Sequence, residues 1–454
     1  MRKWFTFVLC GVVVAAAFAD TGTVQPFVAD RVLVKFHDQF LPEGWRAGDL
    51  TKVHPAIAKL RPVGASYIVG IDVLVIDLKP GSDAPAAVRA LAKHPDVEFA
   101  ELDLIYEALW TPNDPLRPNQ YGLGKIFAYD AWNIWRGDAN FFTCVADTGI
   151  DHAHQDLSGK YAGGHDYVNN DTNPMDDHGH GTHCSGIAAA MTNNGIGIAG
   201  VDPLGRLKAT KVLSSGGSGS TTNISNGITW AANNGCHTVS LSLGGGGFSN
   251  TMNNAVNYAW NAGCVVVAAA GNNGNTTVVY PAGYANALAV ASTTSTDARS
   301  SFSSYGSWVQ VAAPGSSIRS TLRNNTYGDL SGTSMACPHV AGMATWLYSK
   351  LIVNPAQRNV VHAAQIRQII EDTADPVGTF VTKGRVNMNR AIRAIVINGD
   401  VNGDGCVDDR DLAMVLDAYG DSGPNRADLN NTGIVDDADL AIVLNYFGVG
   451  CTSN

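Results

Sequence analysis

The alternation of short apolar runs with helical patterns, beginning near residue 140, constrains the fold of this chain more than any other feature. The runs are rich in β-branched residues and precede glycine-rich turns; they are Phe142–Ala146, Leu207–Leu213, Thr238–Leu243, Val265–Ala270 and Leu288–Ala291. Strands that are apolar on both faces are buried on both faces, so the pattern predicts an α/β fold with a mainly parallel sheet flanked by helices. Functional polar residues are then expected at the C-terminal ends of the strands.

Composition and charge bound the number of units and exclude one class of partner. The 454 residues correspond to about three domains at roughly 150 residues each. The formal net charge of −10 argues against a nucleic-acid binder, which needs a basic face to displace counterions from phosphates. Residues 400–454 contain eleven Asp, no Glu and two Arg, which gives −9. An acidic module is therefore expected at the C-terminal end.

Residues 1–19 have the pattern of a secretory signal. Two basic residues precede an apolar stretch from Trp4 to Phe18, and Ala17 and Ala19 have the A-x-A spacing of a cleavage site. A membrane anchor is the alternative, but the stretch is shorter than the ~20 residues that span a bilayer. We expect a secreted chain with no membrane segment after removal of the signal, in a compartment where disulfides persist.

Residues 20–108 predict a small α+β unit. Apolar alternation at Arg31–Phe36 and Asp72–Asp77 indicates strands, and a helical pattern near Ala86–Lys93 has Asp83 as its N-terminal cap. A proline-rich connector, Trp110–Pro118, follows this unit and indicates an exposed boundary.

Three later segments carry residues suited to nucleophilic catalysis. Asp147 directly follows the first apolar run, His180 lies in H-G-H-G-T-H, and Ser334 lies in S-G-T-S-M-A at a helix start. Serine is a poor nucleophile unless a base removes its proton, and that base needs an orienting acid on its other nitrogen. Free backbone N–H groups at a helix start can bind a developing oxyanion. The order Asp, His, Ser is one of the known orders of such a triad.

Together with S-L-S-L-G-G from Ser240 and A-A-A-G-N ending at Asn272, these segments resemble the subtilisin-like serine proteases, most closely the thermitase and proteinase K branch. The resemblance runs from about Thr111 to Ala394. It implies a serine endopeptidase that acts on proteins or peptides. It also implies an inhibitory prodomain at residues 20–108 and a catalytic domain at 109–396. The alternative for the first unit is a permanent N-terminal domain.

The resemblance assigns roles to four residues. Asp147 would be the orienting acid, His180 the general base, Ser334 the nucleophile and Asn272 the side-chain donor to the oxyanion. Asp147 alone could be a strand-end cap, Ser334 alone a helix cap and Asn272 a turn residue. Zinc is a further alternative because histidines and Cys184 cluster here, but consecutive helix residues face different ways and the spacing matches no zinc pattern.

The primary specificity pocket implied by the resemblance is uncharged and mostly small. Its lining residues would be Ser242, Leu243, Gly244, Gly245, Ala269 and Gly271. Such a pocket favours apolar or aromatic side chains and discriminates weakly, so broad cleavage is expected. Asp176 and Asp177 could select basic residues beside the scissile bond; the alternative is a structural or solvated role.

Calcium is implied by the resemblance at one site of the catalytic domain. The side chains of Asp114, Asp156 and Asn194 would bind the ion together with three carbonyls, those of Met191, Ile196 and Ile198. Oxygen ligands suit this hard cation. Ordinary surface aspartates are the alternative. A second family site near Asp166 and Asp171 is doubtful, because the neighbouring residues Asn169, Asn173 and Met175 depart from an oxygen-rich pattern.

The acidic module contains a tandem repeat. Residues 400–420 and 428–448 match at twelve of twenty-one positions with an offset of 28. Each copy has the rhythm of an EF-hand loop at positions 1, 3, 5, 9 and 12. The oxygen-bearing residues are Asp400, Asn402, Asp404, Asp408 and Asp411 in the first copy, and Asp428, Asn430, Thr432, Asp436 and Asp439 in the second.

Aspartate at position 12 and the following Leu-Ala-x-Val-Leu pattern resemble a type I dockerin, which implies a small all-α module at residues 399–451 that folds with Ca²⁺. Dockerins bind cohesins, but the expected contact pairs here, Asp409-Arg410 and Asp437-Ala438, are not the familiar hydroxyl pairs. A cell-surface or stabilising role is an equal alternative. A protein with a vestigial protease domain and a functional binding module is the competing hypothesis, against which the intact quartet of catalytic residues argues.

Eight cysteines include Cys10, which would leave with the signal. Cys236 and Cys264 precede two presumed neighbouring strands and are a candidate disulfide pair, as are Cys406 and Cys451, which flank the repeats. Cys184 and Cys337 are expected to be buried free thiols.

Overall fold

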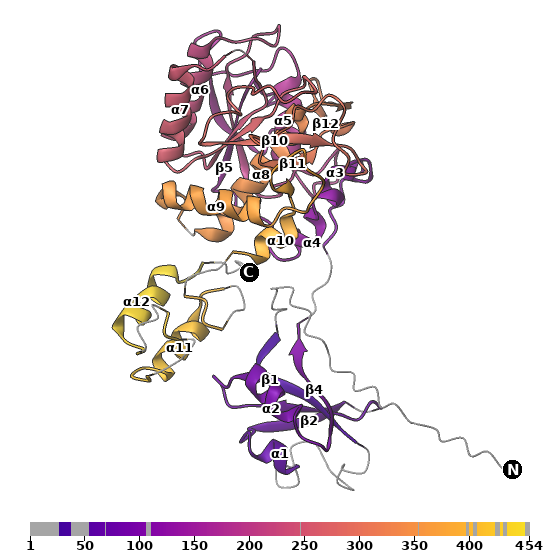
Figure 1. Cartoon of the computed structure of the whole chain (residues 1–454), viewed down its shortest axis with the longest axis vertical. Coiled ribbons are helices and arrows are strands. Elements are labelled where there is room, and N and C mark those ends of the chain that lie inside the picture. Colours follow the sequence, from indigo (N-terminus) through magenta and orange to yellow (C-terminus); the bar gives the residue numbers. More distant parts are fainter. Residues whose placement is uncertain are drawn as a thin grey trace, which may run out of the picture.

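The structure is a computed structural model of the chain, drawn as a ribbon in Figure 1. It describes residues 27–37, 54–68, 70–105, 110–245, 247–352, 354–395, 399–402, 406–422, 427–429 and 434–449. The predicted signal, residues 1–19, lies outside these ranges. Among the described residues, no helix combines the length and apolar character needed to cross a membrane.

The N-terminal unit is an antiparallel sheet of four strands in the order β2-β3-β1-β4, with two helices. Its elements are β1 (Phe27–Phe36), α1 (Pro55–Ala58), β2 (Gly64–Ile68), β3 (Val73–Asp77), α2 (Ala84–Leu91) and β4 (Val97–Leu104). Alternation along β1 buries Val32, Val34 and Phe36. Asp83 caps α2 by accepting a hydrogen bond from the Ala86 amide at 2.9 Å. The strands and the capped helix predicted from the sequence are confirmed.

The main unit contains an eight-stranded sheet in the order β14-β11-β10-β9-β8-β5-β7-β6, whose neighbouring strands pair in parallel. Its strands are β5 (Phe142–Asp147), β6 (Tyr161–Asp166), β7 (Arg206–Lys211), β8 (Thr238–Leu241), β9 (Val265–Ala269), β10 (Ala287–Thr293), β11 (Val311–Pro314) and β14 (Gly384–Arg385). The five predicted runs are five of these strands. The predicted α/β fold with a mainly parallel sheet is therefore confirmed.

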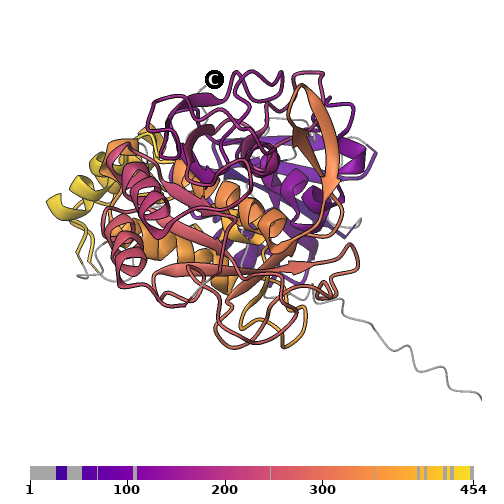
Figure 2. The same ribbon diagram turned by 90° about the horizontal axis from the view of Figure 1, so that it is seen from above.

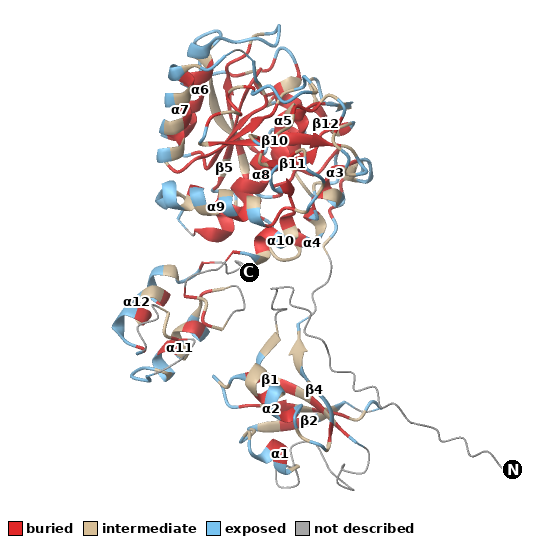
Figure 3. Cartoon of the chain, viewed as in Figure 1, coloured by how far each residue is buried: buried red, intermediate tan, exposed pale blue. Residues whose placement is uncertain are grey.

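Helices cover both faces of this sheet, as Figure 1 and Figure 2 show. They are α3 (Tyr121–Lys125), α4 (Ala128–Trp132), α5 (His180–Ala189), α6 (Thr221–Asn233), α7 (Asn250–Asn261), α8 (Thr333–Leu351), α9 (Val360–Asp372) and α10 (Met388–Arg393). Successive residues of β9 enter opposite cores: Val265 and Val267 pack with α5 and α8, whereas Val266 packs with α6 and α7. This two-sided burial explains the unbroken apolar runs, and it fills the interior of the domain in Figure 3.

A hairpin of β12 (Ile318–Leu322) and β13 (Thr326–Leu330) lies outside the main sheet and contacts α5. The C-terminal module contributes α11 (Asp409–Asp417) and α12 (Asp437–Tyr446), which pack against each other. Asp408 and Asp436 cap these helices, each in a capping box with the aspartate three residues later. The tandem repeat therefore gives two equivalent local structures.

Candidate active site

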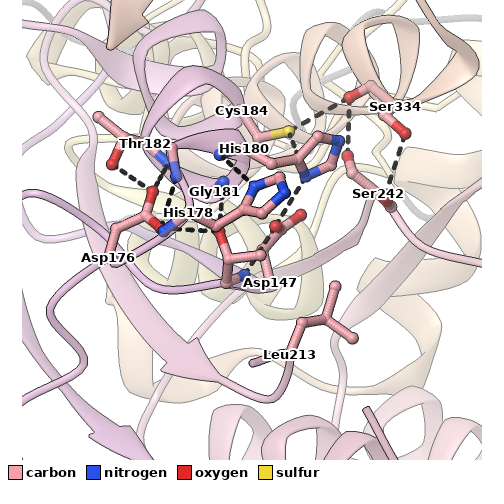
Figure 4. A network of polar contacts seen from close by, with 12 residues as sticks. Asp147, Asp176, His178, His180, Gly181, Thr182, Cys184, Leu213, Ser242 and Ser334 are labelled. Carbon is pink, nitrogen blue, oxygen red and sulfur yellow. Dashed lines mark hydrogen bonds and ion pairs between the residues drawn. The ribbon is translucent and has the colours of Figure 1, made fainter. Parts of the chain in front are cut away.

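Three elements bring the predicted triad residues to one edge of the sheet. Asp147 is the last residue of β5, His180 the first residue of α5 and Ser334 the second residue of α8. The strand end and α5 approach closely because Gly181 has no side chain: a Cβ there would lie 2.2 Å from the Gly149 carbonyl oxygen. Figure 4 shows the imidazole of His180 between the Asp147 carboxylate and Ser334.

The contact between Asp147 and His180 is short and buried on the acid side. His180 Nδ1 lies 2.7 Å from Asp147 Oδ1, and the Asp147 side chain is 0% exposed. The Thr148 amide donates to the same oxygen at 2.7 Å. Burial is the largest single influence on the pKa of His180 and lowers it, but the charge of Asp147, the hydrogen bond to Asp147 and the contact with Cys184 together raise that pKa well above the ordinary 6.5. The carboxylate therefore both orients the ring and stabilises its protonated form.

Ser334 stands beside the imidazole with its hydroxyl turned to another acceptor. Ser334 Oγ donates to the Ser242 carbonyl at 3.1 Å, and Ser242 Oγ donates to the Ser334 carbonyl at 2.8 Å. Among the described residues, the hydroxyl makes no hydrogen bond with His180. Catalytic hydrogen bonds often form only once substrate is bound, and rotation about χ1 of Ser334 redirects the hydroxyl.

Asn272 and the start of α8 form a pair of donors. Asn272 Oδ1 accepts from the Thr333 amide at 2.9 Å and from Thr333 Oγ1 at 3.0 Å, which leaves the Nδ2 amide as the outward donor. A Cβ placed on Gly332 would lie 3.5 Å from both Asn272 Nδ2 and the Ser334 amide nitrogen. The two donors therefore border one point next to the nucleophile, which is the arrangement that stabilises an oxyanion.

The six predicted pocket residues lie on two neighbouring segments, Ser242–Gly245 after β8 and Ala269–Gly271 at the end of β9. Val279, which the sequence did not indicate, lies against both. Its Cγ1 would be 2.7 Å from a Cβ on Gly244, and its Cγ2 would be 3.0 Å from a Cβ on Gly271. Because Val279 is only 7% exposed, it occupies the space between the two walls.

His183 and Cys184, which follow His180 in α5, each have a partner within the protein. His183 Nε2 contacts the Gly328 carbonyl at 3.2 Å, and burial lowers the pKa of His183 to about 4. Cys184 faces His180 instead, with Sγ 4.0 Å from Nδ1, and burial raises the pKa of its thiol. His183 and Cys184 thus face different ways, as the helix geometry predicted. Cys184 lies instead with Asp147 and His180, and one ligand atom from each of these three residues lies within 4.8 Å of the other two.

Asp176 and Asp177 both have partners within the protein, but only Asp176 is buried, whereas the Asp177 side chain is 46% exposed. Asp176 is 1% exposed and accepts several hydrogen bonds, described below, so it cannot contact a substrate. Asp177 pairs with Lys211 Nζ at 2.6 Å. For Asp176, the structural alternative is the one that this geometry supports.

The candidate calcium residues of the catalytic domain are close to one another. Asn194 Nδ2 donates to Asp156 at 2.8 Å, and the Asn194 amide donates to Asp114 at 3.2 Å. Burial raises the pKa of both carboxylates, and the charge of Asp156 adds to the effect at Asp114. The carbonyls of Met191, Ile196 and Ile198 accept no hydrogen bond from the described part of the chain. Two buried acids with raised pKa values, beside carbonyls that accept no hydrogen bond from the described residues, fit a hard cation.

The doubtful second site near Asp166 also has hydrogen-bonded carboxylates. Asp166 accepts from the amides of Val168 and Asn169 and from the Asn169 side chain, at 2.7 to 2.9 Å. Asp171 accepts from the Asn173 amide at 2.7 Å. Asp114 and Asp156 accept comparable hydrogen bonds, so these bonds do not distinguish the two sites, and the second site stays a doubtful prediction.

In the C-terminal module the two position-12 aspartates are buried and equivalent. Asp411 accepts from the amides of Val401 and Asp408, and Asp439 accepts from those of Leu429 and Asp436, at 2.7 to 2.9 Å. Asp400, Asn402 and Asp428 are among the described residues, whereas Asp404, Asn430 and Thr432 lie outside them. The ligand set proposed for either loop is thus described only in part.

One cysteine expectation is wrong and another is confirmed. Cys236 and Cys264 are free thiols: Cys264 Sγ donates to the Cys236 carbonyl at 2.9 Å instead of bonding to its sulfur. Cys184 and Cys337 are buried free thiols, as expected. Cys406 is disulfide-bonded, and its predicted partner Cys451 lies outside the described residues.

Comparison with known proteins identifies the family to which the chain belongs. The model of the subtilase family matches residues 138–433, which is more than half of the chain. The chain belongs to the subtilase family. It is a serine endopeptidase of that family, and a model of the fervidolysin N-terminal prodomain matches residues 15–103.

Individual relatives agree with this membership. The chain is 42% identical over 373 residues to a thermophilic serine proteinase of Bacillus sp. (strain AK1), covering 81% of this chain and 88% of the relative. It is 53% identical over 288 residues to thermitase of Thermoactinomyces vulgaris, covering 63% of this chain and all of the relative (100%). A solved protease structure from Pseudoalteromonas arctica PAMC 21717 aligns with a TM-score of 0.58 at 30% identity, covering 63% of this chain and 99% of that one.

Proposed function

We propose that this subtilase is a secreted, calcium-stabilised endopeptidase that forms an acyl-enzyme on Ser334 and cleaves beside apolar residues with broad specificity. The observation that carries the proposal is the buried 2.7 Å contact between Asp147 and His180 next to Ser334. A serine hydroxyl becomes a nucleophile strong enough for a peptide bond when a base, oriented by an acid, removes its proton.

In the proposed acylation step, each of the four residues has a defined role. Ser334 Oγ attacks the scissile carbonyl while His180 Nε2 takes its proton, and the Asp147 charge stabilises the imidazolium that forms. The side-chain amide of Asn272 and the backbone amide of Ser334 donate to the oxyanion of the tetrahedral intermediate. His180 then returns the proton to the departing amine, the C–N bond breaks and the acyl group remains on Ser334.

Deacylation repeats these steps with water. His180 removes a proton from the water that attacks the ester, the same two amides hold the second oxyanion, and the proton returns to Ser334 Oγ as the acid product leaves. The raised pKa of His180 means that more of the base is protonated near neutral pH. The proposed enzyme therefore works best in alkaline solution.

Specificity is proposed to follow from the uncharged walls and from Val279. Walls without charge favour apolar side chains, and discrimination in such pockets is only about 1–3 kcal/mol per methylene-scale difference. Val279 lies against both Gly244 and Gly271 and reduces the depth between them. We therefore narrow the expectation from apolar or aromatic residues to small and medium aliphatic ones.

Calcium is proposed to bind at Asp114, Asp156 and Asn194, and in the loops of the C-terminal repeats. The support at the first site is the pair of buried carboxylates, whose pKa values are raised by burial. An ion there would supply the positive charge that these acids lack and would tie residue 114 to the loop that follows α5. In the acidic module an ion would offset part of the −9 charge of residues 400–454.

The precursor form is proposed to contain a removable signal and an inhibitory prodomain, followed by cleavage near residues 108–110. The support is the signal pattern and the match to a subtilase prodomain model. A cell-surface role and a cohesin-type partner are the two proposals for the C-terminal module, both resting on its dockerin-like repeat.

The proposal is tested by expressing the full chain and its Ser334→Ala variant with export. The wild type should hydrolyse casein and release a mature form whose N-terminus, read by mass spectrometry, lies near residue 110. Ser334→Ala should accumulate as a precursor without hydrolysis. Equal casein hydrolysis by the two proteins would contradict the proposal.

A further inference from the structure

A second buried aspartate lies behind the triad and accepts hydrogen bonds from two separate segments. Asp176 Oδ1 accepts from Thr148 Oγ1 and from the amides of His178 and Gly179, each at 2.9 Å. Asp176 Oδ2 accepts from the Thr182 amide at 2.9 Å and from Thr182 Oγ1 at 2.6 Å. One carboxylate thus receives five hydrogen bonds, and Figure 4 labels Asp176 with two of the donor residues, His178 and Thr182.

These donors flank His180, the proposed base, on both sides, and one of them directly follows Asp147, the proposed orienting acid. Thr148 is the neighbour of Asp147, and its amide also donates to the Asp147 carboxylate. Gly179 precedes His180, and Thr182 follows it in the first turn of α5. Asp176 therefore joins the segment that carries the acid to the segment that carries the base.

Thr148 makes this connection continuous. Its hydroxyl donates to Asp176 and accepts from the Gly181 amide at 2.9 Å. Gly181 is the next residue after His180, so a chain of three hydrogen bonds runs from the Asp147 carboxylate through Thr148 to Asp176 and to the start of α5. The first-turn amides that a helix leaves unpaired are satisfied in this way.

The two segments have little freedom to move apart or together. A Cβ on Gly149 would lie 2.5 Å from the Pro174 carbonyl oxygen, and Gly149 has φ +113°. On the far side, Lys211 Nζ donates to the Thr148 carbonyl at 2.7 Å and to the Leu213 carbonyl at 3.0 Å. The position of Thr148, and with it Asp147, is thus fixed from both sides.

We propose that Asp176 is a positioning residue for catalysis, which holds His180 in register with Asp147 through Thr148 and the first turn of α5. The inference rests on the proposed function and deepens it. Asp176 is 1% exposed and touches no substrate, so it acts through the triad and not on the reacting atoms. Its loss should lower turnover while substrate binding is preserved.

The test uses Asp176→Asn in the full chain, which keeps the size of the side chain but replaces one acceptor oxygen by an NH₂ group that faces the Thr182 amide. Active sites are titrated by fluorophosphonate labelling run to completion. Per titrated site, kcat should fall by about 10- to 100-fold with KM within about 3-fold, because small displacements of a reacting group are costly.

A second pair of variants keeps the test decisive where Asp176→Asn does not fold. Thr148→Val removes the bridging hydroxyl and should lower kcat about 10-fold, whereas Thr148→Ser restores the hydroxyl and should stay within about 3-fold of wild type. If Thr148 had only a structural role, both Thr148→Val and Thr148→Ser would have lower thermal stability, and Thr148→Ser would show no recovery of kcat relative to Thr148→Val.

The matched control is Asp202→Asn. Asp202 is also a fully buried, hydrogen-bonded aspartate, but it accepts from the Gly205 amide just before β7 begins, at the opposite end of the sheet. The Asp202→Asn variant should be less stable than the wild type but should have the same kcat. A kcat for Asp176→Asn within about 3-fold of wild type, or equal impairment of Thr148→Val and Thr148→Ser, would overturn the inference. Absence of labelling in the wild type would instead refute the proposed function.

Discussion

Replacing Asn272 by aspartate tests its proposed role as a donor to the oxyanion. Asn272 Oδ1 accepts from the Thr333 amide at 2.9 Å and from Thr333 Oγ1 at 3.0 Å, and a carboxylate oxygen can accept both bonds equally well. The Nδ2 donor is replaced by an oxygen. Since residue 272 is exposed, the new charge stays solvated, and the change in stability should be within about 0.5 kcal/mol.

The catalytic cost should be much larger than the structural one. Loss of one donor of this kind costs about 10²–10³ in kcat, or ~2.7–4 kcal/mol of transition-state stabilisation. The introduced carboxylate would add repulsion against the negative oxygen that develops beside it, so the lower end of that range is the minimum expected. KM should change little, because the donor acts on the oxyanion and not on the ground-state substrate.

The assay is steady-state hydrolysis of a chromogenic peptide, normalised to titrated active sites, for wild type, Asn272→Asp and Asn273→Asp. Asn273 is the exposed neighbour, and its replacement adds the same charge while the donor is retained. We expect the kcat of Asn273→Asp within about 3-fold of wild type. A loss below 10-fold in Asn272→Asp, or equal losses in the two variants, would refute the assignment of Asn272.

Three further predictions follow from the site and its surroundings. The base must be unprotonated to act, and the charge of Asp147 and the hydrogen bond to it help to raise the pKa of His180 above 6.5. In a pH–rate profile, kcat/KM should therefore rise with pH along a limb centred above 6.5. A limb centred at or below 6.5 would contradict the raised pKa of His180. Chelation of Ca²⁺ should lower the Tm of the catalytic-domain transition by about 5–10 °C, since an ion at 100 times its Kd contributes about 2.7 kcal/mol. In calorimetry of Asp156→Asn, chelator should have little further effect on that transition, and a chelator-independent catalytic-domain transition in the wild type would exclude the ion at this site. Val279→Ala should raise kcat/KM for an aromatic P1 relative to an aliphatic one about 10-fold on matched peptides, and an unchanged ratio would remove Val279 from the pocket.

Much of the fold could be predicted because burial on two faces leaves a strong pattern. The runs at β5, β7, β8, β9 and β10 are apolar on consecutive positions, and each is a strand. Strand β6, Tyr161–Asp166, was not predicted because it lies at the sheet edge and its sequence, Y-A-G-G-H-D, contains two glycines and no apolar run. The short β14 contains only two residues and carries no periodic signal.

The triad was accessible from the sequence because each member sits in a local motif at an element terminus. Contacts between distant loops were not. Val279 lies against Gly244 and Gly271 only after folding, and nothing in its own neighbourhood indicates a pocket. The candidate disulfide between Cys236 and Cys264 is wrong, because the Cys264 thiol donates to the Cys236 carbonyl and both cysteines are free; proximity along neighbouring strands does not by itself give a disulfide. A structural role for Asp176 is one of the alternatives that the sequence offers. Its hydrogen bond with Thr148 could not be predicted, because it depends on packing between residues 28 positions apart.

The central claim is that one hydroxyl, at Ser334, is made nucleophilic by His180 and Asp147. Intact-mass and peptide mass spectrometry after fluorophosphonate treatment tests it most directly. The account predicts one adduct per mature chain, located on Ser334, formed slowly or not at all in His180→Ala, and absent from Ser334→Ala. An adduct on another residue, or a correctly matured wild type that hydrolyses peptides without being labelled, would contradict it.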